Sequence, residues 1–441
     1  MKGHRIYIQA FVFIVFLAQM SIGQDNSTRI SNYDIAATLD TAAGQFYVKA
    51  KLSIEKSDSA EILQLLLNSG IRLDSIIGEG GGASSSITHE FTGKDTIQLK
   101  LPTTLFSSGR FSIDFYYSYP IGKPTDAPLL LDRGHRWYPL IMDNIANLYL
   151  TVATPGDFEV FSAGDMTSMT KMTDSTWMVW ETAFPIFKIP LVIVKNGYYK
   201  KISKGCDNER EINLYYVSAD SALAQSMIDE VCRSFEFYSE YIGEYGHNSL
   251  QLLEVPQFPG TNIGSGIITF GKDEVEAFKI GNKDAIDLAV ADQWMGAGIF
   301  GKFPSRGFWF MSISMPHYLR MMYLQKVEGE EVFQKNLNNS YNAYKPFAGT
   351  EKDMPILDVD FLNTKEKGAI TYGKGPYVVN ILRKRLGDDT WHEFWRRLYR
   401  EYQGKIISFD QLIEFMAGYD RDGIVVPELK KMVSEKGLLP E

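Results

Sequence analysis

The residues from Asp287 to Gly296 have the spacing of a metal-binding helix but not its side chains. Two histidines at positions i and i+4 of a helix can bind zinc, and a glutamate beside the first histidine can act as a general base. Here the corresponding positions hold Leu288, Ala289 and Asp292. Leucine has no lone pair for a metal, alanine cannot accept a proton, and one aspartate falls short of the three protein ligands of a catalytic zinc.

Four flanking segments place this helix in a larger pattern. Residues 293–296 read QWMG, residues 260–270 upstream read GTNIGSGIITF, and downstream lie WFMSISM at 309–315 and ITYGKGP at 370–376. In this order and at this spacing, the segments resemble the gluzincin zinc aminopeptidases, the family of membrane alanyl aminopeptidase and leukotriene hydrolase. In that family the zinc helix reads H-E-x-x-H-Q-W-F-G and the loop that binds the substrate amine reads G-A-M-E-N-W-G-L-I-T-Y.

The resemblance implies a role for each aligned position, and most positions hold a residue that cannot perform it. The degenerate positions are Ile263 for the amine-binding glutamate, Leu288 and Asp292 for two zinc ligands, Ala289 for the general base, and Ser312 for the third ligand. Met311 takes the third-ligand position if the family spacing is held strictly. Tyr372 is the one catalytic-type residue that is retained, and its role in the family is to stabilise the tetrahedral intermediate with a hydrogen bond.

The resemblance also implies a substrate groove, which would be lined by Gly260, Thr261, Asn262, Gly264 and Tyr372. We therefore expect a non-catalytic exported homologue of the zinc aminopeptidases that has no metal cofactor and binds a peptide, a protein partner or nothing in this groove. The alternative is an active metalloaminopeptidase with a relocated or unusual zinc site.

The six histidines do not display such a second site by their spacing. They are scattered, with no partner histidine at i+3 or i+4. Only His317 lies near the lost third-ligand position, where it could approach Asp292. A histidine with an ordinary structural role is the more common case.

The first 23 residues are predicted to be a signal peptide. A basic start is followed by an apolar run from residue 6 to 22 and by small residues before Gln24. The competing interpretation is a retained N-terminal membrane anchor, because the apolar run approaches the length that spans a bilayer. Removal of these residues leaves 43 basic and 54 acidic side chains, a net charge of −11. Such acidity argues against a nucleic-acid partner, and we expect a periplasmic or extracellular protein.

Cys206 and Cys232 are the two cysteines of the 441-residue chain. In an oxidising compartment they could form a disulfide, which would contribute about 3 kcal/mol in the chain-entropy model. The sequence leaves the pairing open, because Cys206 is predicted in a loop and Cys232 in a helix. A metal site built from these two residues, without a nearby histidine, is much less expected.

Hydrophobic periodicity divides the mature chain into a β half and a helical half, which predicts the α+β class. Residues 24–204 contain alternating runs at 45–54, 96–101, 111–117 and 147–152, typical of an antiparallel β domain, with a flexible hairpin connection over 78–86. Residues 205–441 resemble the thermolysin-like lobe of the family. Helices are expected there at 221–242, 283–299, 308–326, 330–343, 374–386 and 389–402.

Overall fold

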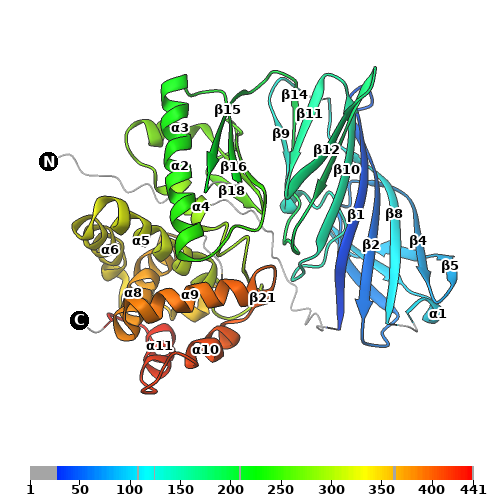
Figure 1. Cartoon of the computed structure of the whole chain (residues 1–441). Helices are drawn as coiled ribbons and strands as arrows, with labels where there is room; N and C mark the ends of the chain where they lie inside the picture. The colour runs from blue at the N-terminus through cyan, green and yellow to red at the C-terminus, as the bar shows by residue number, and fades with distance from the viewer. Residues whose placement is uncertain (1–26, 107–108, 124, 208–209, 361–363, 440–441) are drawn as a thin grey trace.

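The structure is a computed structural model that describes residues 27–106, 109–123, 125–207, 210–360 and 364–439. The predicted signal peptide lies outside the described residues. The fold belongs to the α+β class, as the sequence predicts: a β half is followed by a largely helical half (Figure 1).

A large twisted sheet dominates the first half of the chain. Its strands run in the order β12 (Asp165–Lys171), β13 (Ser175–Glu181), β10 (Asn147–Pro155), β1 (Thr28–Asp40), β2 (Gln45–Lys56), β8 (Arg110–Pro120), β4 (Arg72–Gly80) and β5 (Ala83–Ser86). Neighbouring strands are antiparallel except β1 and β10, which pair in parallel. The predicted hairpin over residues 78–86 is confirmed as the β4–β5 connection.

Two small sheets pack with the large one. One contains β11 (Phe158–Ser162), β14 (Leu191–Lys195) and β9 (Leu129–Leu131), and the other contains β3 (Ile62–Leu66), β7 (Thr96–Lys100) and β6 (Thr88–Phe91); the short helix α1 (Thr103–Phe106) follows β7. Burial alternates along β2, where every second side chain enters the core, so the period-two runs of the sequence are confirmed as strands.

The second half begins with a mixed sheet in the order β15 (Lys200–Cys206), β16 (Arg210–Tyr216), β17 (Ser249–Glu254), β19 (Ile267–Phe270) and β18 (Thr261–Gly264). Helix α2 (Ser221–Tyr241) packs on this sheet. Its N-terminus is capped by Asp220, whose carboxylate accepts a hydrogen bond from the Leu223 amide, which confirms the helix predicted over 221–242. A short parallel pair, β20 (Phe300–Gly301) and β21 (Ile406–Ile407), lies among the helices.

The remaining helices are α3 (Lys272–Lys279), α4 (Asp284–Ala291), α5 (Met315–Glu328), α6 (Glu330–Tyr344), α7 (Lys365–Ala369), α8 (Gly375–Leu386), α9 (Asp388–Tyr402), α10 (Phe409–Ala417) and α11 (Val425–Ser434). Of these, α5, α6, α8 and α9 match predicted ranges, α4 is shorter than predicted, and α3, α7, α10 and α11 were not predicted. Two wide π-helical turns, η2 (Phe310–Ser314) and η5 (Ile370–Lys374), lead directly into α5 and α8.

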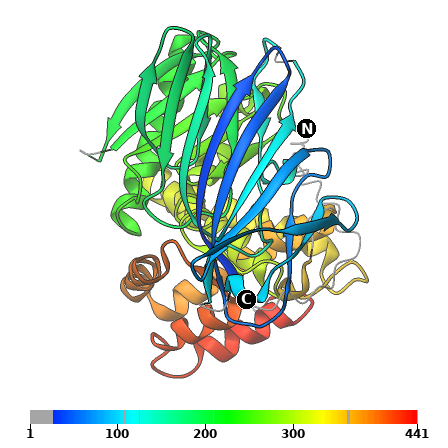
Figure 2. The same ribbon diagram turned by 90° about the vertical axis from the view of Figure 1, so that its right-hand side faces the viewer.

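Two hydrophobic cores hold the molecule together. One fills the β half, and the other fills the helical half from Cys206 onward. Leu253, Val255 and Ile267, on β17, the segment after it and β19, belong to the first core, so the mixed sheet packs against the β half (Figure 2). Strand β15 spans the predicted boundary between residues 204 and 205 and pairs with β16 of the second half. The division into two domains at this boundary stays a proposal. No helix within the described ranges is long and apolar enough to cross a membrane.

The prediction of one helix over residues 283–299 is wrong beyond Ala291. Helix α4 ends there, and the chain turns at Gly296, whose φ of 144° is costly for other residues. Tertiary contacts hold this turn. The Gln293 side chain donates to Gly264 O, at the end of β18, and the Trp294 indole donates to Gly243 O after α2. These contacts join the turn to segments that are distant in the sequence, so periodicity alone could not place the end of the helix.

Candidate ligand-binding site

Asp292 caps the C-terminal end of α4 and is the centre of a group of polar side chains. Its side chain lies beneath the turn at Gly296, where an added Cβ would be 3.3 Å from Asp292 Oδ1. That oxygen is buried and has no hydrogen-bond partner among the described residues. Burial raises the pKa of Asp292 well above its usual range, while the nearby positive charge of Lys188 opposes the rise.

Lys188 reaches this group from the β half of the molecule. It lies in the segment between β13 and β14, and its ammonium donates a 2.5 Å hydrogen bond to Asn262 Oδ1 of β18, 74 residues further along the chain. Burial lowers the pKa of Lys188 to about 8, and the charges of Asp132 and Asp292 counteract part of this effect. The residue as a whole is partly exposed, but burial desolvates its ammonium.

Strand β18 carries the segment that resembles the amine-binding loop. It is the edge strand of the mixed sheet and pairs with β19 so that Asn262 is opposite Thr269 and Ile263 is opposite Ile268. Thr261, Asn262 and Gly264 are buried, whereas Ile263 is partly exposed and packs against the core of the helical half. Helix α4 packs beside this strand, which brings the expected loop and the degenerate helix together.

Two π-helical turns supply the other side chains of the group. Turns η2 and η5 contact each other, and Ser314 donates a 2.8 Å hydrogen bond to Thr371 O between them. Burial raises the pKa of the Tyr372 phenol in η5, and the Asp292 carboxyl adds to this effect. The rings of Tyr372 and His317 meet edge to face with centroids 5.5 Å apart. π turns of this kind occur frequently at functional sites.

His317 is expected to be uncharged at neutral pH. Burial, followed by the charge of Arg320, lowers its pKa to about 3, and its Nδ1 has no hydrogen-bond partner among the described residues.

The other aligned positions contribute little polar chemistry. Leu288 is partly exposed one helical turn before Asp292, and Ala289 is fully buried in the core of the helical half. Met311 is also fully buried, whereas Ser312 is partly exposed, so exposure favours Ser312 as the counterpart of the third ligand. Ser312 Oγ lies against Gly301 of β20, where an added Cβ would be 2.8 Å away.

The donor set around Asp292 does not fit zinc. Zinc needs about three His, Cys, Asp or Glu ligands at close range. This position offers two such residues, Asp292 and His317, and His317 is linked to the group only by its ring contact with Tyr372. Across the described ranges of the chain, ligand atoms of three such residues come within 4.8 Å of one another only at Cys206, Cys232 and Glu236.

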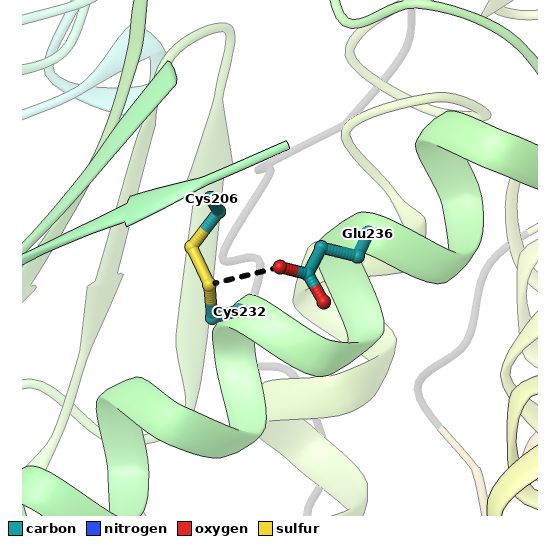
Figure 3. Close-up of side chains that lie close together, drawn as sticks. All are labelled: Cys206, Cys232 and Glu236. Atoms are coloured by element: carbon teal, nitrogen blue, oxygen red, sulfur yellow. Dashed lines mark hydrogen bonds between the residues drawn. A yellow bond between two sulfur atoms is a disulfide. The ribbon is translucent and has the colours of Figure 1, made fainter. Parts of the chain in front are cut away.

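That second position is closed to a metal because its sulfurs are bonded to each other. Cys206 and Cys232 form a disulfide that joins the end of β15 to α2, with Cα atoms 5.7 Å apart, so the pairing that the sequence left open is present (Figure 3). Cys232 Sγ lies 3.7 Å from Glu236 Oε1, but a disulfide has no thiolate to offer as a ligand.

A serine, a histidine and an aspartate come together at the contact between the two halves, which the sequence did not predict. His247 Nε2 lies 2.9 Å from Ser265 Oγ, and His247 Nδ1 lies 3.5 Å from Asp165 Oδ2. This spatial arrangement of serine, histidine and aspartate resembles a hydrolase triad, but His247 and Ser265 are almost fully buried. Asp165 instead accepts hydrogen bonds from the amides of residues 248 and 249. We interpret this group as a structural link between the β half and the mixed sheet.

An open depression of about 330 Å³ lies on the outer face of the large sheet, where it is lined by Tyr47, Tyr116 and Trp177 among others. It contains none of the aligned positions. Buried polar atoms without a partner occur at several places in the described part of the chain. Two of them, Asp292 Oδ1 and His317 Nδ1, belong to the group around the aligned position Asp292, so we place the candidate site there.

Lys188 is the residue of this site that sequence reasoning missed. The available signal was one lysine within the otherwise apolar run PIFKIPLVIV at 185–194, where Ile186 and Ile189 are buried. A lysine among buried residues is uncommon unless it has a partner or a function.

Comparisons with known proteins agree with this architecture. No family model matches the sequence, and no curated protein matches it. Among solved structures, an M1 zinc metallopeptidase from Deinococcus radiodurans is similar with a TM-score of 0.73 and 14% identity, covering 94% of this chain and 95% of that one. A mutant of that peptidase bound to a Tyr-Ser-Ala substrate gives a TM-score of 0.74 with 14% identity, covering 94% and 96%. A two-domain M1 zinc metallopeptidase mutant bound to L-tryptophan gives 0.71 with 15% identity, covering 94% and 96%.

Proposed function

We propose that this chain, which has the fold of the M1 zinc metallopeptidases, is a pseudoenzyme that binds a peptide or a protein partner without hydrolysing it. The binding region is the site formed by β18, the end of α4 and the π turn that carries Tyr372. The proposal includes export from the cytoplasm and the absence of a zinc cofactor.

The chemistry of the donor set is the observation that carries this proposal. The positions aligned with two zinc ligands and the general base hold Leu288, Asp292 and Ala289, and Ala289 points into the core. A peptide hydrolase of this type needs a metal to polarise the carbonyl and activate water. The site nevertheless keeps polar groups that are incompletely paired, and such groups are suited to holding a ligand.

The alternative, an active metalloaminopeptidase with an unusual metal site, has one observation in its favour. His317 has an unpaired Nδ1 and contacts Tyr372, which in turn lies near Asp292. A neutral imidazole is a good zinc ligand, so His317 and Asp292 would be the first two ligands of such a site. A third would have to come from a rearrangement of the chain.

Hydrolysis and binding measured on the same preparation distinguish the two functions. The protein would be incubated with zinc and a Tyr-Ser-Ala peptide, the sequence seen bound to the similar peptidase. We expect saturable binding by calorimetry and no release of free tyrosine above that from a buffer blank. Zinc-dependent release that disappears in His317→Ala would establish the active alternative. Leu386→Ala, at the distant end of α8, provides the matched control for a general loss of stability.

Export rests on the sequence of the first 23 residues. The test is N-terminal sequencing of the protein recovered from its native host. Cleavage before Gln24 and recovery outside the cytoplasm are expected. Recovery of the uncleaved chain in the membrane fraction would instead support the N-terminal anchor.

A further inference from the structure

Lys188 is a cation with unfilled hydrogen-bonding capacity at the proposed binding site. An ammonium has three donors, and among the described residues the Lys188 ammonium donates only to the neutral oxygen of Asn262 and forms no ion pair. The charges of Asp132 and Asp292 act on this ammonium without a direct ion pair, and desolvation of a charge without a directly bonded counterion is unfavourable. A lysine held in this way has free donors with which to bind an anion.

The neighbouring Arg133 does not compete for this role. It is buried, and its guanidinium donates to the backbone carbonyls of Ile141, Met142 and Phe187 while lying over the Phe187 ring. These three hydrogen bonds hold the segment that carries Lys188. Arg133 is therefore structural, and Lys188 provides the available donors.

The charge around β18 is the opposite of what binding to a free amine requires. The position that would hold the amine-binding carboxylate is Ile263, which is neutral and partly exposed. The adjacent Asn262 is bonded to a cation instead. A protonated amino terminus would be repelled from Lys188, whereas a carboxylate would be attracted.

We propose that Lys188 and Asn262 bind the C-terminal carboxylate of a peptide, with Lys188 supplying charge-assisted hydrogen bonds and the Asn262 side chain holding the ammonium in place. This inference rests on the proposed peptide-binding function and specifies which end of the peptide enters the site. The ligand is thus oriented in the reverse sense to an aminopeptidase substrate.

The test compares the ends of one peptide by calorimetry with the full exported protein at pH 7. The probes are N-acetyl-Tyr-Ser-Ala with a free carboxylate, the same peptide as its C-terminal amide, Tyr-Ser-Ala amide with a free amine, and sodium acetate. A charge-assisted hydrogen bond predicts that the free carboxylate binds about tenfold to a hundredfold more tightly than either amide. Acetate should bind more weakly than the acetylated peptide, since it lacks the peptide contacts.

Variants assign the preference to the lysine. Lys188→Met should reduce the affinity for the carboxylate peptide to that of the amide, and Lys188→Arg should retain most of the preference. Lys272→Met, an equal change of charge at an exposed position on α3, is the matched control and should leave both affinities unchanged. Circular dichroism would establish that each variant is folded.

Each contrary result has a separate meaning. Equal binding of the acid and the amide, or a preference that persists in Lys188→Met, overturns the carboxylate inference and leaves peptide binding intact. Acetate binding as tightly as the peptide overturns the peptide as the source of the carboxylate. A lack of binding by every peptide overturns both this inference and the proposed function.

Discussion

Replacing Lys188 with methionine should make the protein more stable at neutral pH. The ammonium is held in a desolvated position with one neutral hydrogen-bond partner, so the fold carries an electrostatic cost that the unfolded chain does not. Methionine has a similar length and flexibility and removes the charge. A binding residue that destabilises the free protein is a known compromise between stability and function.

The pKa of Lys188 gives the size of the effect. Burial lowers it from the ordinary 10.5 to about 8, and each pKa unit corresponds to about 1.4 kcal/mol. The charged form therefore costs about 3 kcal/mol of unfolding free energy at pH 7. Loss of the hydrogen bond to Asn262 offsets about 1 kcal/mol. The expected net gain for Lys188→Met is about 2 kcal/mol.

The pH dependence identifies the cause. Below pH 8 Lys188 is protonated in both the folded and the unfolded state, so the full electrostatic cost is present. Between pH 8 and 10.5 the folded state releases this proton first, and the stability of the wild type rises relative to that of Lys188→Met. We expect urea unfolding at pH 7 to show the gain and unfolding above pH 10.5 to show none. Other titrating groups cancel in the difference. A variant less stable than wild type at pH 7, or a gain that does not change with pH, would refute this reasoning.

Three further predictions concern other parts of the helical half. Burial raises the pKa of Asp287 to about 8 against the opposing charge of Arg320, so the stability due to this group falls as pH rises from 4 to 8. Asp287→Asn should therefore raise the free energy of unfolding by on the order of 3 kcal/mol at pH 7, measured by urea unfolding. An equal increase at pH 4 would contradict this explanation. Replacing both cysteines with alanine should lower stability by about 3 kcal/mol in thermal unfolding, and unchanged melting would show that the disulfide does not constrain the chain. The folded triple variant Leu288→His, Asp292→His and Ser312→Glu should bind one zinc by native mass spectrometry, whereas Asp292→His alone should not; failure of the triple variant would count against the alignment.

Local patterns predicted most elements because the same side chains that set the period also form the cores. Alternation in β2 and the Asp220 cap of α2 are examples in which local chemistry and tertiary packing agree. The end of α4 could not be predicted in this way. Its position depends on hydrogen bonds from Gln293 and Trp294 to segments that are distant in the sequence.

The candidate site was predictable only where it follows a linear motif. The segments containing Ile263, Asp292 and Tyr372 could be aligned, and the structure brings them into one region. Lys188 could not be assigned to that region, because its partner Asn262 is contributed by the other half of the molecule. The charge of a binding site is the sum over all segments that reach it, and a motif reports only one of them.

The central claim is that this fold binds no catalytic zinc at the position of Asp292. The most direct measurement is the zinc stoichiometry of residues 24–441 by native mass spectrometry, after the protein is produced with zinc supplied and loosely bound metal is washed away. We predict the mass of the metal-free chain. One tightly held zinc per chain, lost in Asp292→Asn or His317→Ala, would contradict the account and establish the unusual metal site.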